Sequence, residues 1–315
     1  MSMDEAIRKG GGEIPGRDRR RNWTEWAMWL LVGGLLLYMY GVDGNNEQAD
    51  THGRSAVMWM VSRWRWSGAD MSHGWLIPFV SAFVLWRKRK DWSLAAKDLS
   101  LAGLGVVVAA LLLYVVGLRV QQTRLVLLSL IALLWGIPFF VYGRRIAGIL
   151  LFPCAYLVFC IPMTFLEDLT LPLRLISTSV SSVLLNGLAI PVTRAGTAIH
   201  VETGGGFALD VGHPCSGLRY LTAMVAVTVV YAYFSHREPW KRVVLTLASV
   251  PLAMVGNIAR IVLIAMVGTW FGVERAVGFY HDYSGYVVFA VAALLMVITG
   301  NSLDRVGKER KAGQQ

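Results

Sequence analysis

The chain alternates long apolar runs with shorter polar segments from about residue 23 to about residue 300. Because a helix needs roughly 20 apolar residues to cross a bilayer, these runs predict transmembrane helices. The second run is short for a crossing, and the seventh is long enough to contain a break. We predict an all-α polytopic membrane protein with about eight transmembrane helices. Their approximate ranges are 23–42, 73–86, 100–118, 125–142, 146–166, 215–234, 243–270 and 285–300.

The first run follows a basic segment and continues to Tyr40 without the small-residue cleavage site of a signal peptide. We therefore expect a retained first helix. The predicted organisation is a basic tail over residues 1–22, one polytopic domain over 23–300 and a second tail over 301–315.

Basic residues are distributed unequally between the two sets of connecting segments. If the N-terminus is cytoplasmic, the inner segments hold 20 of the 30 Lys and Arg residues and the outer segments hold eight. The other two, Arg219 and Arg260, lie within spans. Cytoplasmic loops of membrane proteins carry the excess of basic residues, so both termini are predicted to lie inside.

The two long segments predicted to lie outside are residues 43–71 and 167–214. Within the second, the stretch 175–190 is expected to lie flat in the outer interface or to dip into the membrane. Alternation in Thr197–Thr203 and in Phe207–Val211, around a glycine turn, predicts a β-hairpin that leads directly towards Cys215.

Composition supports the membrane interpretation. Hydrophobic residues make up 55% of the chain and charged residues 16%, which is too apolar for an ordinary soluble domain. The net charge of +10 arises beside the apolar runs, so it indicates orientation and not a nucleic-acid partner. The three cysteines lack metal-ligand spacing and predict no disulfide framework; we expect no metal ion and no cofactor.

Cys215 lies in the run Val211-Gly-His-Pro-Cys-Ser-Gly-Leu-Arg-Tyr220, at the predicted start of the sixth span. A helix N-terminus and nearby cationic groups favour a thiolate over a thiol. Two other ionisable residues are predicted to approach the same outer face. Arg260 lies inside the seventh span, where a charge costs a few kcal/mol, and His281 lies just before the eighth.

These residue types suffice for acyl transfer through a thioester. A thiolate attacks a peptide carbonyl, an imidazole delivers a proton to the leaving amine, and a guanidinium stabilises the oxyanion or fixes the thiolate. Each residue also has a structural explanation, because many Cys and His residues near helix ends only pack. Arg260 is the hardest to explain in that way, since the spans offer almost no carboxylate to pair with it.

Several neighbours are supporting candidates. His213 is an alternative proton partner to His281, and the sequence leaves that choice open. Asn257 is one turn before Arg260 on the same helix face. The other candidates are Arg219, His73 and Asp282. We expect His52, His200 and His236 to be surface residues.

At these residues the chain resembles the exosortase/archaeosortase family of integral-membrane cysteine transpeptidases. The resemblance rests on Cys215-Ser-Gly-Leu-Arg219, Asn257-Ile-Ala-Arg260 and the His281 segment, in that order. Ser72-His-Gly74, followed by an apolar run and Arg87-Lys-Arg-Lys90, is also similar to the family's N-terminal half.

The resemblance implies that Cys215, Arg260 and His281 are catalytic. It also implies membrane-anchored protein substrates of the PEP-CTERM type, whose tail has a Pro-Glu-Pro-like motif, one transmembrane helix and a basic end. Such systems accompany exopolysaccharide production in Gram-negative bacteria, so we expect a multi-pass protein of the inner membrane with its active site on the periplasmic face.

The alternative hypothesis is a transporter or export component for exopolysaccharide or lipid, in which Arg260 binds an anionic headgroup. Transporters often show interrupted helices at matching positions of two repeats, and the sequence shows no such pairing. A transporter would tolerate loss of the Cys215 thiol, whereas a cysteine transpeptidase would not.

Overall fold

The computed structural model describes residues 15–47, 53–65, 71–96, 98–162, 166–203, 206–210, 218–277 and 279–312. The described chain is mostly helical, with a small antiparallel sheet, which agrees with the predicted class. Within this part, four helices are long and apolar enough to cross a membrane, and Leu221–Ser235 is a shorter apolar helix. The count of eight transmembrane helices stays a prediction.

The chain forms two compact units, of which the first comprises residues 1–63 and 82–161. Its main elements are α2 (Pro15–Leu36), the π-helix η1 (Leu37–Val42), most of α4 (Ala56–Arg65), α6 (Arg89–Leu94), α7 (Leu101–Arg119), α8 (Thr123–Tyr156) and the 3-10 helix η3 (Leu157–Cys160). The second unit comprises residues 64–81 and 162–315, and the short predicted second span, η2 (Ser72–Trp75) and α5 (Leu76–Arg87), runs from the second unit into the first.

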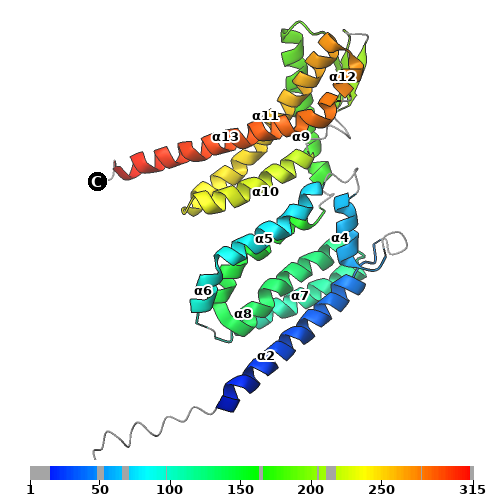
Figure 1. The fold of residues 1–315 in the computed structure, drawn as a ribbon. Coiled ribbons are helices and arrows are strands. Elements are labelled where there is room, and N and C mark those ends of the chain that lie inside the picture. The colour runs from blue at the N-terminus through cyan, green and yellow to red at the C-terminus, as the bar shows by residue number, and fades with distance from the viewer. Residues whose placement is uncertain are drawn as a thin grey trace, which may run out of the picture. The chain divides into compact units, whose positions relative to one another are not determined.

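The first unit is built on α7 and α8, which lie side by side (Figure 1). The buried residues of α7 are Gly103, Ala110 and Gly117, a stripe of small residues seven apart. Small residues let two helices approach closely where no water is available to drive packing. The α7–α8 pair is therefore held by close backbone contact.

Helix α8 contains a kink at Gly143, whose φ of 82° and ψ of −173° are not helical. This kink separates the predicted spans 125–142 and 146–166, as the turn at 143–145 indicated. The carbonyls released there accept backbone hydrogen bonds from Asp98 and Ser100. The predicted end at residue 166 was wrong, because η3 ends at Cys160 and is followed by extended backbone at Ile161, next to Pro162.

The second unit contains α9 (Leu166–Gly187), α10 (Leu218–Ser235), α11 (Pro239–Phe271), α12 (Val273–Val277) and α13 (Phe279–Ala312). Helix α11 packs against each of the other four, and it is the central helix of the unit (Figure 1). The sequence left open whether this long span contains a break, and α11 is one helix with Pro251 inside it. Helix α13 continues through most of the predicted 301–315 tail.

The sheet of the second unit has the order β1-β2-β3, with β1 at Val192–Ala195, β2 at Ala198–Val201 and β3 at Phe207–Asp210. The predicted hairpin is confirmed as β2 and β3, which pair from Val201↔Phe207 to Ala198↔Asp210. Strand β1 was not predicted. Its two-residue connection to β2 begins at Gly196, whose φ of 63° suits a tight hairpin turn.

Candidate functional site

Arg260 and Asn257 lie on α11, the helix at the centre of the second unit. Helix α11 starts with Pro239 in its first turn, a position where the missing N–H costs nothing, and it then runs for 33 residues. Arg260 is 3% exposed and Asn257 is 7% exposed. Eleven residues separate Arg260 from Phe271, which is about 16 Å along the helix axis. A cation and an amide are thus buried one turn apart near the middle of an apolar helix.

The side-chain amide of Asn257 has an oxygen that can accept a hydrogen bond. Its Oδ1 atom is buried and has no hydrogen-bond partner among the residues that the structure describes. A buried amide oxygen left without a donor costs about 1–3 kcal/mol. Such an acceptor marks a place where a ligand or a neighbouring segment is expected to donate a hydrogen bond.

The three-stranded sheet packs directly on the C-terminal half of α11. Ile199, Val201 and Leu209 of the sheet belong to one hydrophobic core with α11. The α11 residues of this core all follow Arg260: Ile261, Ile264, Ala265 and Val267. The Phe207 ring lies so close to Gly268 that a Cβ atom there would collide with it. Strand β3 is therefore anchored on the helix that carries Arg260.

The segment that contains Cys215 is bounded on both sides by elements packed near α11. Strand β3 ends at Asp210, five residues before Cys215, and α10 begins at Leu218, three residues after it. Helix α10 packs against α11 and α13. Cys215 and His213 themselves lie outside the described residues, so their proposed roles rest on sequence.

Arg219 belongs to the first turn of α10, and the structure describes its backbone only. The same holds for His281 and Asp282, which lie in the first turn of α13. The sequence placed His281 before the eighth span, and the helix in fact begins at Phe279, two residues earlier than His281. Helix α13 packs against both α10 and α11, so it belongs to the same helical group as Arg260.

His73 is half-buried in η2, and it also belongs to the second unit. The neighbouring Trp64 and Trp75 rings meet edge to face at 5.1 Å. The Arg65 guanidinium lies 5.5 Å from the centre of the Trp75 ring. The Ser72-His-Gly74 motif is thus packed beside two tryptophans.

The thiols of Cys154 and Cys160 are reduced and buried in the first unit. Cys154 packs with Ile146 and Leu150 in an apolar cluster. Cys154 therefore contributes to the packing of that cluster. The candidate site residues all fall in the sequence ranges of the second unit.

The prediction that His236 is a surface residue was wrong. His236 is 3% exposed, and its Nδ1 atom lies 3.1 Å from Oδ1 of Asp304. Lys241 Nζ donates to the same Asp304 oxygen at 2.9 Å and lies 3.0 Å from Glu238. The sequence gave no signal for this cluster, because Asp304 is 68 residues from His236. His200, in contrast, is exposed on β2 as predicted, and His52 lies outside the described residues.

Comparisons with known proteins give one family. No curated protein and no solved structure matches the chain. The family model of the transmembrane exosortases (Exosortase_EpsH) matches residues 64–298, about three quarters of the chain. The match includes all of the candidate site residues and leaves out α2. With a buried Arg260 at the centre of its second unit and several long apolar helices, this chain belongs to the transmembrane exosortase family.

Proposed function

We propose that this protein is a membrane-embedded cysteine transpeptidase or protease that cleaves a C-terminal sorting signal from exported proteins, with Cys215 as its nucleophile. The family is known for cysteine-type transpeptidases that process such signals. The observation that carries the proposal is the buried Arg260 on α11. The elements on both sides of the Cys215 segment belong to the unit built around that helix.

In the proposed reaction the Cys215 thiolate attacks the carbonyl carbon of the scissile peptide bond. The carbonyl electron pair moves to oxygen, and Arg260 donates hydrogen bonds to the oxyanion or holds the thiolate in place. His281, or alternatively His213, gives a proton to the nitrogen as the C–N bond breaks. The acyl group stays on Cys215 as a thioester until water or an amine attacks it and restores the thiol.

Asn257 has a positioning role in this proposal. Its buried Oδ1 atom accepts a hydrogen bond from a backbone N–H of the substrate or of the Cys215 segment. The acceptor would then fix the carbonyl that Cys215 attacks relative to Arg260. Arg219, Asp282 and His73 remain supporting candidates near the ends of α10, α13 and α5.

The proposed substrates are PEP-CTERM proteins, each anchored by its own transmembrane helix beside a basic end. The excess of basic residues predicts that both termini of the enzyme lie inside and the Cys215 segment outside. A substrate helix oriented by the same rule would present its sorting motif at the outer face. The enzyme would thus work at the periplasmic side of the inner membrane.

The test is co-expression of the full chain with a tail-bearing PEP-CTERM protein, followed by mass spectrometry of the substrate's new C-terminus. We expect Cys215→Ala to abolish cleavage while the protein still accumulates in the membrane. Cys154→Ala is the matched control, because it removes a thiol that is buried in the first unit. Cleavage that persists in Cys215→Ala at the level of the control would overturn the proposal.

A further inference from the structure

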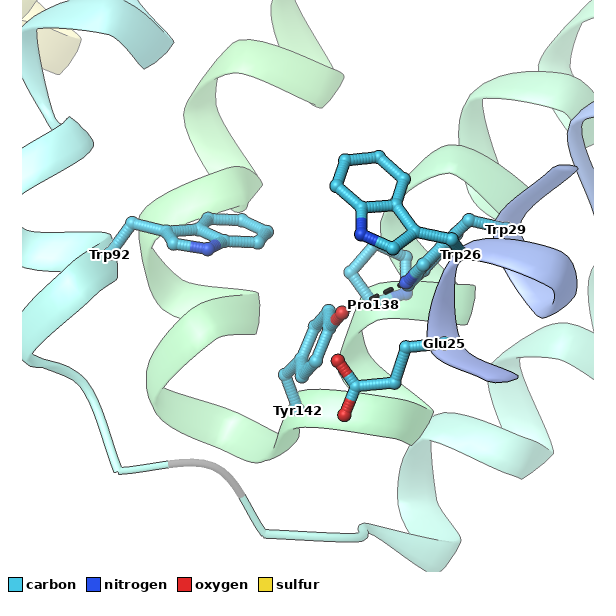
Figure 2. Close-up of a pocket in the computed structure, with 6 residues that line it drawn as sticks. All are labelled: Glu25, Trp26, Trp29, Trp92, Pro138 and Tyr142. Carbon is cyan, nitrogen blue, oxygen red and sulfur yellow. Dashed lines mark hydrogen bonds between the residues drawn. The ribbon is translucent and has the colours of Figure 1, made fainter. Parts of the chain in front are cut away.

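An aromatic pocket lies in the first unit, and none of its lining residues takes part in the proposed reaction. It has a volume of about 630 Å³, within the range of small-molecule sites. Its walls come from Glu25, Trp26 and Trp29 of α2, from Trp92 of α6, and from Pro138 and Tyr142 of α8 (Figure 2). The family match begins at residue 64, so α2 adds three of the six lining residues from outside it.

The pocket walls are held in place by contacts among the rings. Trp29 Nε1 donates a hydrogen bond to the Tyr142 hydroxyl at 3.0 Å, and the two rings stack with centres 5.8 Å apart. Trp92 meets Tyr142 edge to face at 5.9 Å. Both Trp92 and Tyr142 also pack on the buried cluster around Ile146. Tyr142 is therefore the shared wall that orders the other aromatic side chains.

The chemistry of the lining favours an organic cation. Ring faces attract cations, and an ammonium group within about 6 Å of a Trp ring gains roughly 0.5–2 kcal/mol. Glu25 supplies the one group among the six lining residues that is charged at neutral pH, and in Figure 2 its carboxylate lies beside Tyr142. An aromatic pocket with one carboxylate and no basic lining residue is suited to an ammonium group.

The sequence next to two of the lining residues is rich in basic residues. Arg144 and Arg145, both exposed, follow Tyr142 after Gly143, and the run 87–90 of four basic residues precedes Trp92, with Asp91 between them. A ligand with only positive charge would be repelled by these groups. A ligand that carries a phosphate next to its ammonium would match both the basic rim and the acidic, aromatic interior.

The rest of α2 gives such a ligand an apolar surface. Leu30 and Leu31 are 74% and 70% exposed and follow Trp29 on the helix. Exposed apolar side chains of a membrane helix face lipid chains, and Trp and Tyr favour the headgroup level. The basic residues also mark this end of the helices as the one predicted to face inward.

We propose that this pocket binds the zwitterionic headgroup of a phospholipid, with the ammonium among Trp29, Trp92, Tyr142 and Glu25 and the phosphate at the basic rim. This proposal uses none of the peptide-processing residues and does not depend on their assignment. It would fix α2 on the α6–α8 surface through a bound lipid. An aromatic belt that only anchors the helices would show no preference for an ammonium group.

The test uses the delipidated full chain in detergent and native mass spectrometry with two lipids that have the same acyl chains. Phosphatidylethanolamine carries the ammonium group, and phosphatidylglycerol lacks it. We expect phosphatidylethanolamine to be retained at least about tenfold better, as the cation–π and carboxylate contacts imply. Glu25→Gln and Trp92→Leu should each remove most of this preference.

Trp23→Leu is the matched control, because Trp23 is an exposed tryptophan of α2 that does not line the pocket. It should leave the preference unchanged. Equal retention of the two lipids by the unmodified chain would overturn the proposal. Glu25→Gln and Trp92→Leu variants that retain the same lipid preference as Trp23→Leu would also overturn it. Displacement of the lipid by an arginine-rich peptide at the same concentration would overturn the lipid assignment.

Discussion

Each of the two units buries an asparagine, and the two side chains differ in their hydrogen bonding. In the first unit, Asn45 is fully buried, accepts a 2.7 Å hydrogen bond from Thr123 Oγ1 and donates one of 2.6 Å to the Gly53 carbonyl. In the second unit, Asn257 keeps a buried Oδ1 atom with no partner in the described part of the chain. A satisfied polar group stabilises its surroundings, whereas an open acceptor beside Arg260 is suited to a substrate.

The difference extends to the helices that carry these groups. Helix α7 buries only small residues against α8, and the nearby Tyr40 hydroxyl is paired with Ser129 at 2.7 Å. Helix α11 buries Arg260 near its middle and supports the sheet that leads to Cys215. We therefore interpret the first unit as a packed membrane scaffold with the proposed lipid pocket. The second unit holds the residues of the proposed reaction.

The largest effect is expected for Arg260. Arg260→Lys keeps a positive charge but loses the forked donors, and we expect substrate processing to fall by about 100-fold or more. Rates of cleavage of a tail-bearing substrate in proteoliposomes measure this loss. Arg275→Lys is the control, since Arg275 is exposed on α12. Full activity of Arg260→Lys and Arg260→Ala would remove the functional contrast between the units.

The next effect concerns the contact that seats the sheet on α11. Gly268→Ala places a Cβ atom against the Phe207 ring, and we expect overpacking to cost about 1–3 kcal/mol and to lower processing. Gly148→Ala is the control, because nothing lies within 4 Å of the Cβ position there. Thermal unfolding in detergent and cleavage rates test both variants. Unchanged cleavage in Gly268→Ala would show that the sheet does not position the Cys215 segment.

The paired asparagines give a direct test of the comparison. Asn45→Ala leaves Thr123 without its acceptor and should lower the free energy of unfolding by about 1–3 kcal/mol, with little change in cleavage per folded molecule. Asn257→Ala should lower cleavage with a smaller change in stability. Asn46→Ala, at an exposed neighbour, is the control for the first unit. The reverse pattern would contradict the assignment of roles.

The smallest effect is expected from the cluster at the end of α13. The hydrogen bond from Lys241 lowers the pKa of Asp304 below its ordinary value of 3.8, and the charge of His236 acts in the same direction. A carboxylate with a lowered pKa stabilises the fold at neutral pH, and this contribution is lost as the pH falls through its folded pKa. Asp304→Asn should therefore lower the melting temperature slightly at pH 7 and by less at pH 3. An equal loss at both values would show that the charge is not involved.

Much of the fold followed from local sequence pattern. The apolar runs predicted the helices, the Gly143-Arg-Arg145 turn predicted the division of α8, and alternation around a glycine turn predicted the β2–β3 hairpin. Strand β1 was missed because four residues after a proline carry too short a pattern to distinguish a strand from a loop. The burial of His236 was missed because its partner Asp304 comes from a distant part of the chain.

For the site, the sequence by itself determined the residue types and their family: Cys215, Arg260 and His281 in that order, and an arginine inside an apolar span. It could do so because a charge at membrane depth is costly and stands out in the sequence. Only the tertiary structure decided that the sheet packs on α11 next to Arg260, that Asn257 has an open acceptor within the described residues, and that tryptophans from α2 and α6 meet at Tyr142. Those facts depend on contacts between residues far apart in the chain, which no local pattern encodes.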